Sequence, residues 1–298
     1  MEYEDLIREK ISDAKDISLI SETNNKVYKV EKDDETLFAK FYLNRSSHID
    51  HEMQLYGIID NKYLKDIVCS SEEPQFTIFK ELKGTTIDEL SDEAKQANAE
   101  KVVSAVIDFY SSCEQHKLEG FGLVDKDMKG ESESFADFIT KRQLDTQNVL
   151  KDYPIVNNAF TRIYEKYGDK LTIDNSIVPI DTNMKNIMLT EDGAVKFIDP
   201  GEIISAPILM GYGDFLAHTY KTPFGDELLK RLNLNEEQEK ELRIYAVFSL
   251  MNVLAFLKNL GVDDLQSQIP YGNKITFFDL ISEHLDYLSL GKDKEIER

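Results

Sequence analysis

One stretch of the sequence, residues 178–201, constrains the fold of this chain most strongly. In it, short apolar segments alternate with polar residues. The first leads into Asp181, and an asparagine follows five positions later, at Asn186. Two further apolar runs, joined by the turn 191–193, lead to Asp199, and Gly201 follows two residues after it. Strands joined by a tight turn lie side by side. We therefore expect Asp181, Asn186 and Asp199 to meet at one place, where a glycine lets the backbone turn away sharply.

This order of residues is that of a kinase catalytic loop followed by a metal-binding loop. In such loops one aspartate orients the attacking hydroxyl, while an asparagine and a second aspartate hold the metal. Carboxylate and carboxamide oxygens are ligands that Mg²⁺ prefers. The pattern predicts Asp181 as the catalytic carboxylate and Asn186 and Asp199 as ligands of Mg²⁺. The alternative interpretation is a solvated hairpin whose carboxylates only stabilise turns.

A second set of candidate residues lies near the N-terminus. Strands are expected there at 17–20, 26–30 and 36–42. The third strand places Lys40 between aromatic residues, and a buried lysine is costly unless it is paired. A helix expected at 47–59 supplies Glu52. In kinases a lysine of the third strand holds the phosphates and pairs with a glutamate of the next helix. We predict these roles for Lys40 and Glu52; the alternative is a surface lysine and a solvated glutamate.

The rest of the chain changes from strands to helices after a short polar link at 80–84. Helices are expected at 91–113, 134–150, 157–167, 214–219, 225–232, 236–260 and 277–288. The sequence therefore predicts an N-terminal nucleotide-binding lobe, residues 1–83, and a C-terminal catalytic and substrate-binding lobe, residues 84–298. A link between a small sheet lobe and a helical lobe is where a kinase receives the adenine.

The composition excludes several kinds of partner. With 35 Lys and Arg residues against 56 Asp and Glu residues, the net charge is −21. Nucleic acids and anionic membrane surfaces require basic patches, so neither is expected as a partner. The acidic charge is compatible with a cationic small molecule. Only two cysteines are present and no signal-peptide pattern opens the chain, so a cytoplasmic location is expected. The apolar segment 244–260 contains Asn252 and Lys258 and indicates a buried helix rather than a membrane span.

Taken together, these motifs resemble those of the aminoglycoside phosphotransferase and choline kinase family of protein-kinase-like small-molecule kinases. The segment 198–201 is similar to the family's Ile-Asp-x-Gly form, and 211–217 is similar to its later Asp-Leu-Ala segment. The aspartate of that later segment, here Asp214, usually braces the catalytic loop. The resemblance implies an α+β, bilobal, protein-kinase-like fold. Its N-terminal lobe would be a small antiparallel β-sheet with one helix, and its C-terminal lobe larger and mainly helical.

The resemblance also implies a nucleotide site. The Lys80 carbonyl and the Leu82 amide would meet the adenine, and the loop carrying Ser21, Asn24 and Asn25 would lie over the phosphates. This loop contains no glycine, but small-molecule kinases often use a polar loop here. A clearer departure is Pro179, which stands where the family usually has the histidine of a His-Gly-Asp motif. That histidine normally supports the metal loop.

The function expected from these features is transfer of the γ-phosphate of ATP to a hydroxyl of a small, amine-bearing molecule. An aminoglycoside antibiotic is the first candidate acceptor, with choline, ethanolamine, another amino-alcohol or a sugar as alternatives, and GTP remains open as donor. A catalytically silent nucleotide-binding regulator is the second interpretation, because of Pro179. A protein kinase ranks last, because too few residues separate Asp199 from Asp214 for a usual activation loop. Either a monomer or a homodimer is compatible with the sequence.

Overall fold

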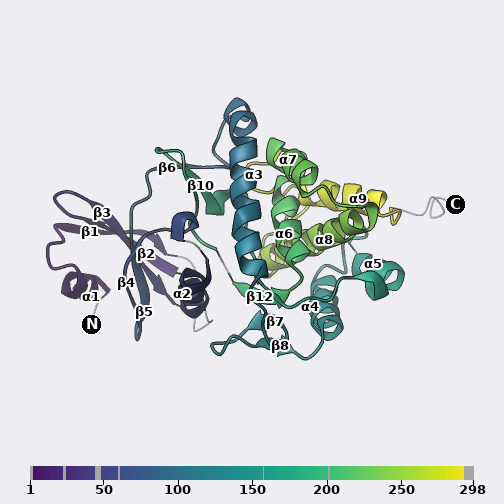
Figure 1. Cartoon of the computed structure of the whole chain (residues 1–298), viewed down its shortest axis with the longest axis horizontal. Coiled ribbons are helices and arrows are strands. Elements are labelled where there is room, and N and C mark those ends of the chain that lie inside the picture. The colour runs from purple at the N-terminus through teal and green to yellow at the C-terminus, as the bar shows by residue number, and fades with distance from the viewer. Residues whose placement is uncertain are drawn as a thin grey trace.

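The computed structural model describes residues 3–22, 25–43, 48–59, 61–156, 158–200 and 202–291, and for residues 48–52 and 61 only the backbone. Asn24 and Gly201, both named above, therefore lie outside the described residues. The chain forms a sheet-rich lobe on the left of Figure 1 and a larger helical lobe on the right. This arrangement confirms the expected α+β, bilobal, kinase-like fold.

The N-terminal lobe is built on one antiparallel sheet of five strands. Its strands, in spatial order, are β1 (Asp16–Glu22), β2 (Asn25–Glu31), β3 (Thr36–Tyr42), β5 (Gln75–Lys80) and β4 (Ile67–Glu72). Two helices, α1 (Tyr3–Lys10) and α2 (His48–Ile58), one more than the fold expected for this lobe, and the 3-10 turn η1 (Asn61–Tyr63) accompany it. The strand expected at 36–42 is confirmed. The loop expected to carry Ser21, Asn24 and Asn25 was predicted too long. Ser21 and Asn25 lie in the strands β1 and β2, which remain paired as far as Glu22 and Lys26.

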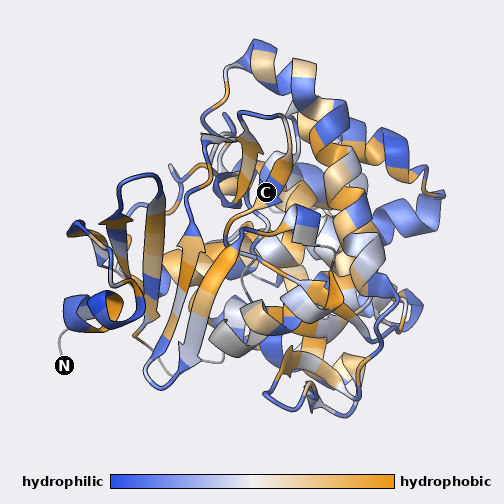
Figure 2. Cartoon of the chain, turned by 60° about the vertical axis from the view of Figure 1, so that its left-hand side comes forward, coloured by the Kyte–Doolittle hydropathy of each residue, from blue (hydrophilic) through white to orange (hydrophobic). Residues whose placement is uncertain are grey.

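The sheet and α1 enclose a hydrophobic cluster of their own. Its buried members are Ile7, Ile11, Tyr28, Val30, Leu37, Ala39, Phe41, Phe76 and Ile78. In Figure 2 the strands carry hydrophobic residues, while α1 is largely hydrophilic on its outer side. A second, larger cluster fills the helical lobe, and it includes Tyr63 and Leu64 from the segment before β4. The division at residue 83 stays a prediction.

Two small sheets carry the segments of the candidate site. The first has the order β11 (Val195–Phe197), β10 (Ile187–Thr190), β6 (Gly84–Thr86), and the second β8 (Gly130–Ser132), β7 (Phe121–Val124), β12 (Ile203–Ala206), β9 (Ser176–Pro179). The expected hairpin around the turn 191–193 is confirmed as β10 and β11. A Cβ atom at Gly84 would lie 2.4 Å from the Leu189 carbonyl oxygen, so a glycine is needed where β6 meets β10.

The helical lobe is organised around α3 and α8. Its helices are α3 (Asp92–Glu114), α4 (Phe135–Val149), α5 (Ala159–Tyr167), α6 (Ile208–Thr219), α7 (Pro223–Leu232), α8 (Glu236–Asn259) and α9 (Phe277–Tyr287), with the 3-10 turns η2 (Gly168–Lys170) and η3 (Met184–Asn186). The Ser91 and Ser134 side chains accept hydrogen bonds from backbone amides of the first turns of α3 and α4. Among the described residues, no helix is long and apolar enough to cross a membrane.

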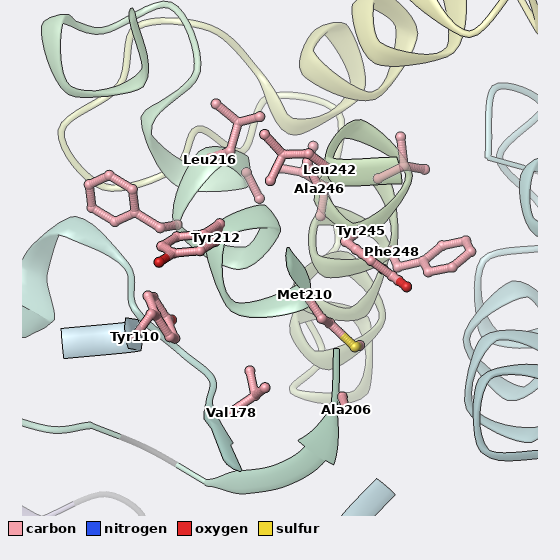
Figure 3. Packing of buried hydrophobic residues seen from close by; sticks show 14 of the residues in the cluster. Tyr110, Val178, Ala206, Met210, Tyr212, Leu216, Leu242, Tyr245, Ala246 and Phe248 are labelled. Atoms are coloured by element: carbon pink, nitrogen blue, oxygen red, sulfur yellow. The ribbon is translucent and has the colours of Figure 1, made fainter. Parts of the chain in front are cut away.

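Helix α6 begins six residues earlier than the sequence suggests. Glycines lower helix propensity, and Gly211 and Gly213 lie in this first part. Both are required by packing, because a Cβ at Gly211 would lie 2.3 Å from the Tyr110 ring and one at Gly213 would lie 2.5 Å from the Tyr245 Cβ. Figure 3 shows the close packing of residues from α6 against those of α8. Tertiary packing therefore overrides the weak local helix propensity here.

A buried histidine of α9 contacts Arg243 of α8. His284 is fully buried, its ring lies 4.5 Å from that of Tyr220, and its Nδ1 is 3.5 Å from an Arg243 guanidinium nitrogen. Burial, and then the charges of Arg243 and Lys221, lower the pKa of His284 from 6.5 to about 3. The ring is therefore neutral in the folded chain at pH values where it would be charged after unfolding.

Because His284 is neutral in the folded chain, we expect the free energy of unfolding to fall in mild acid. The pKa of the folded state lies below that of the unfolded state, so the stabilisation is complete above pH 6.5 and is lost as the pH falls towards 3. The free energy of unfolding should fall by about 1.4 kcal/mol per pH unit from this group. Urea unfolding between pH 7.5 and 5 should show a shallower pH dependence for His284→Gln than for the parent. The control is His116→Gln at an exposed histidine; equal slopes for all three chains would contradict this account.

Candidate active site

The loop expected to be catalytic follows β9 and holds Asp181 through both of its carboxylate oxygens. The Asn183 side-chain amide donates to Asp181 Oδ1 at 2.5 Å, and that of Asn186 donates to Oδ2 at 3.2 Å. Asn186 also donates to the Asp181 carbonyl oxygen at 2.9 Å. The backbone of Asp181 has φ 69°, a left-handed conformation that non-glycine residues rarely adopt. Surrounding hydrogen bonds therefore fix the carboxylate, and strain of this kind is typical of functional sites.

Asp214 of α6 braces this loop through hydrogen bonds with Thr182. Its Oδ2 accepts hydrogen bonds from the Thr182 amide at 2.8 Å and from the Thr182 hydroxyl at 3.0 Å. Its Oδ1 accepts a hydrogen bond from the Ser249 hydroxyl of α8 at 2.6 Å. Asp214 is only 8% exposed, so these three donors compensate the cost of burying the carboxylate. The bracing that the resemblance implied for Asp214 is thus present.

Lys40 of β3 reaches across the two lobes to Asp199. Its Nζ lies 3.0 Å from Asp199 Oδ1, and Lys40 is 7% exposed. The side chain of Asp199 is 48% exposed, so this carboxylate remains accessible. Glu52 lies in α2, but its side chain is outside the described residues, and its pairing with Lys40 stays a prediction. The structure brings Lys40 to Asp199 of the loop expected to bind the metal; the binding of phosphate by Lys40 stays a prediction.

The environment of Asp181 favours its protonated form. Surrounding protein atoms, followed by the negative charge of Asp214, raise the pKa of Asp181 from 3.8 to about 7. Hydrogen bonding from Asn183 and the charge of Lys185 act in the opposite direction. The residue is nevertheless exposed by surface area, so a reactant can reach it. An accessible carboxyl group with a pKa near neutrality is suited to accepting a proton.

The residues expected to bind Mg²⁺ offer a suitable set of donor atoms. Asp199 supplies a carboxylate, and the carboxamide oxygen of Asn186 is available because its amide nitrogen donates to Asp181. The Ile198 amide donates to the Asn186 carbonyl at 2.9 Å, which ties the two ligand-bearing segments together. The described residues contain no cluster of three or more His, Cys, Asp or Glu side chains suited to a metal. Two protein oxygens fit Mg²⁺, which usually keeps waters and phosphate oxygens as its other ligands.

The residues expected to contact the nucleotide lie on the N-terminal lobe and its link. Lys80 ends β5, and the next residue, Glu81, donates its amide to the Thr36 carbonyl at 3.0 Å. Leu82 is half-buried in the link that follows. Ser21 and Asn25 lie in β1 and β2 on either side of the undescribed residue Asn24. The contacts of all five with a nucleotide stay predictions.

Several residues that shape the site were missed by the sequence analysis. They are Thr182, Asn183, Ser249 and Tyr110. Asn183 carries a local signal, because its side chain caps η3 by accepting a hydrogen bond from the Lys185 amide. Ser249 and Tyr110 lie inside long helices, where no local pattern distinguishes them from packing residues.

Comparison with solved structures shows that the fold is that of protein-kinase-like phosphotransferases. No family model and no curated protein sequence matches the chain. A thermostable mutant of aminoglycoside phosphotransferase APH(4)-Ia, in ternary complex with AMP-PNP and hygromycin B, aligns over 97% of both chains with a TM-score of 0.71 and 13% identity.

Two other small-molecule kinases are similar to the chain. Choline kinase LicA from Streptococcus pneumoniae aligns over 96% of this chain and 98% of its own, with a TM-score of 0.64 and 14% identity. A putative fructosamine-3-kinase from Haemophilus somnus 129PT aligns over 95% of both chains, with a TM-score of 0.59 and 12% identity. These neighbours match the family that the sequence motifs resemble, and they establish the fold.

Proposed function

We propose that this chain is an ATP-dependent phosphotransferase that phosphorylates a hydroxyl group of a small molecule. The observation that carries the proposal is the Asp181 carboxylate, which accepts a hydrogen bond on each of its oxygens. The ion pair between Lys40 and Asp199 of the proposed metal-binding loop supports it. The fold shared with phosphotransferases, some of them solved with AMP-PNP or ADP, supports a nucleotide as the second reactant. A solvated hairpin would not require the Lys40–Asp199 contact, which joins residues 159 positions apart.

In this proposal Asp181 orients the acceptor hydroxyl and takes its proton as the acceptor oxygen bonds to the γ-phosphorus. The bond between that phosphorus and the bridging oxygen breaks, and ADP leaves. Asn183 and Asn186 hold the carboxylate in the required direction. Lys40 binds phosphate oxygens of the nucleotide, and Glu52 orients Lys40. Asn186 and Asp199 hold Mg²⁺, which when bound neutralises charge on the phosphates. Catalysis of this kind is mostly positioning and electrostatic stabilisation.

The proposed nucleotide site lies between lobes 1–83 and 84–298. The Lys80 carbonyl and the Leu82 amide would bind the adenine, and Ser21, Asn24 and Asn25 would lie over the phosphates. We propose a cytoplasmic location, where ATP is supplied. The free cysteines Cys69 and Cys113 agree with a reducing compartment.

An amine-bearing acceptor fits the charge around the site. The negative charges of Asp214 and Asp199 both act on Asp181, so a cationic group beside the acceptor hydroxyl would be attracted. The solved neighbours include kinases of aminoglycosides, choline and fructosamines, and one is in complex with hygromycin B. We therefore rank an aminoglycoside first, followed by choline, ethanolamine or another amino-alcohol, and then a sugar.

Binding of Mg-ATP should stabilise the chain against heat. A ligand at a concentration of about 100 times its Kd adds about 2.7 kcal/mol to the free energy of unfolding, which should raise the Tm by roughly 5 °C. Part of this rise should vanish when EDTA removes Mg²⁺. Lys40→Met should weaken the rise, whereas Lys15→Met, at an exposed lysine of the same lobe paired with Asp33, should not. No change in Tm with millimolar Mg-ATP or Mg-GTP would contradict the proposed site, whereas binding without ATP consumption over a wide acceptor panel would favour the nucleotide-binding regulator.

A further inference from the structure

One buried tyrosine of α3 contacts the catalytic loop on both sides of Asp181. The Tyr110 hydroxyl lies 3.1 Å from the Pro179 carbonyl oxygen, two residues before Asp181. It also lies 3.0 Å from the Thr182 hydroxyl oxygen, one residue after Asp181. Tyr110 has no exposed surface, and because the Thr182 hydroxyl donates to Asp214, the single Tyr110 hydroxyl hydrogen is shared between these two acceptors. A single phenol group therefore joins the two flanks of the residue proposed to be catalytic.

The contact continues into the hydrogen bonds that brace the loop. The Thr182 hydroxyl donates to Asp214 and accepts from the Tyr110 hydroxyl, and the Thr182 amide also donates to Asp214. Asp214 in turn accepts a hydrogen bond from Ser249 of α8. The loop is thus held by groups from three helices, α3, α6 and α8. Pro179 has neither a backbone N–H nor a side-chain hydrogen-bonding group, so support at this position must come from elsewhere in the fold.

Packing fixes the Tyr110 ring at this place. A Cβ atom at Gly211 would lie 2.3 Å from the ring, so only glycine leaves room for it. The Tyr212 ring contacts it edge-on, with centroids 5.1 Å apart. Figure 3 shows Tyr110 between Tyr212 and the strand that carries Val178. With the ring fixed, the position of the hydroxyl, and of the loop bound to it, is fixed as well.

We propose that the Tyr110 hydroxyl is a positioning group that holds Asp181 in its left-handed conformation and directs its carboxylate towards the acceptor. The inference rests on the proposed function, because it assigns Tyr110 a part in the same reaction. A residue with φ 69° persists only where its surroundings determine its conformation. The Tyr110 hydroxyl holds the backbone on both sides of Asp181 through its contacts with Pro179 and Thr182. Asn183 and Asn186 hold the Asp181 carboxylate through their hydrogen bonds to it.

The test compares Tyr110→Phe with Tyr212→Phe. Both variants remove one hydroxyl from a buried ring of the same aromatic pair. The Tyr212 hydroxyl donates at 3.4 Å to the Ile107 carbonyl of α3 and not to the loop. The amide hydrogen exchange of Thr182, measured in the nucleotide-free chains, reports whether the loop has opened. Mg-ATP affinity and phosphate release from Mg-ATP, with water as the acceptor, report the effect on the site.

In Tyr110→Phe, the amide hydrogen of Thr182 should exchange about tenfold faster than in the parent, while the exchange rates of the α8 amides should equal those of the parent. Phosphate release should fall by about 10-fold to 100-fold with the Mg-ATP Kd unchanged, because a small displacement of a catalytic group lowers the rate rather than the affinity. Tyr212→Phe should change none of these quantities. Equal Thr182 exchange in both variants, or a uniform rise of exchange across α3, α6 and α8, would overturn the proposal. The exchange measurement needs no turnover, so a parent chain that binds Mg-ATP but transfers phosphate to no acceptor would count against the proposed function and leave this test intact.

Discussion

Asp181→Asn should lower the rate of phosphoryl transfer by about 10²-fold or more, the scale of losing a general base. Asparagine has nearly the same shape as aspartate, but it carries no charge and cannot accept the proton of the acceptor hydroxyl. Asp181 lies on the loop and not in the nucleotide contacts, so the affinity for Mg-ATP should remain nearly intact. The rate and the affinity should therefore separate in this variant.

The control for this prediction is Asp192→Asn, at the exposed turn of the β10–β11 hairpin. Its rate should equal that of the parent. Turnover and Tm are to be measured together, because an aspartate that only stabilises a turn would lower the Tm and leave the rate unchanged. An Asp181→Asn chain as active as the parent would refute the assigned role.

Asp199→Asn should abolish the part of nucleotide binding that depends on Mg²⁺. Mg²⁺ is held most strongly by anionic oxygens, and Asp199 is the only carboxylate in the proposed pair of protein ligands. The substitution also removes the charge 3.0 Å from Lys40 Nζ, so the phosphate-binding lysine loses its ion pair with Asp199. We expect turnover to fall by at least about 10²-fold, since metal and phosphate positioning both suffer.

Thermal shift with ATP, in the presence of Mg²⁺ and then of EDTA, measures this effect directly. In the parent, ATP should raise the Tm more with Mg²⁺ than with EDTA. In Asp199→Asn, ATP should raise the Tm equally in both conditions, by the smaller amount that the parent shows with EDTA. Asp33→Asn, at an exposed partner of Lys15, is the matched control and should behave as the parent does. A shift in Asp199→Asn that still depends on Mg²⁺ would place the metal elsewhere.

The parts of the site that the sequence could predict are those encoded locally. Asp181 and Asn186 lie on one loop, and the short hairpin that follows brings Asp199 next to them, so order and spacing sufficed. The buried lysine of β3 was predictable for the same reason, because strand alternation places Lys40 among aromatic residues. The two-lobed arrangement followed from the change from strands to helices after the link at 80–84.

The parts that could not be predicted depend on contacts between distant segments. The Lys40–Asp199 hydrogen bond joins residues 159 positions apart, and no pattern in β3 specifies it. Tyr110 contacts the loop from the last part of α3, and Ser249 of α8 contacts Asp214, which braces the loop. Neither residue differs from its buried helix neighbours by any local pattern. The early start of α6 was missed because Gly211 serves tertiary packing and not local helix propensity.

The most direct test of the account is transfer of labelled phosphate from the γ-position of ATP to a panel of acceptors by the parent chain with Mg²⁺. The panel should contain aminoglycosides, choline, ethanolamine, other amino-alcohols and sugars, with Asp181→Asn as the negative control and mass spectrometry to locate the new phosphate. We predict that at least one amine-bearing alcohol gains one phosphoryl group on a hydroxyl, and that Asp181→Asn does not catalyse this at a comparable rate. Mg-ATP binding without transfer to any acceptor of the panel, by a chain that is folded and monodisperse, would contradict the proposed activity.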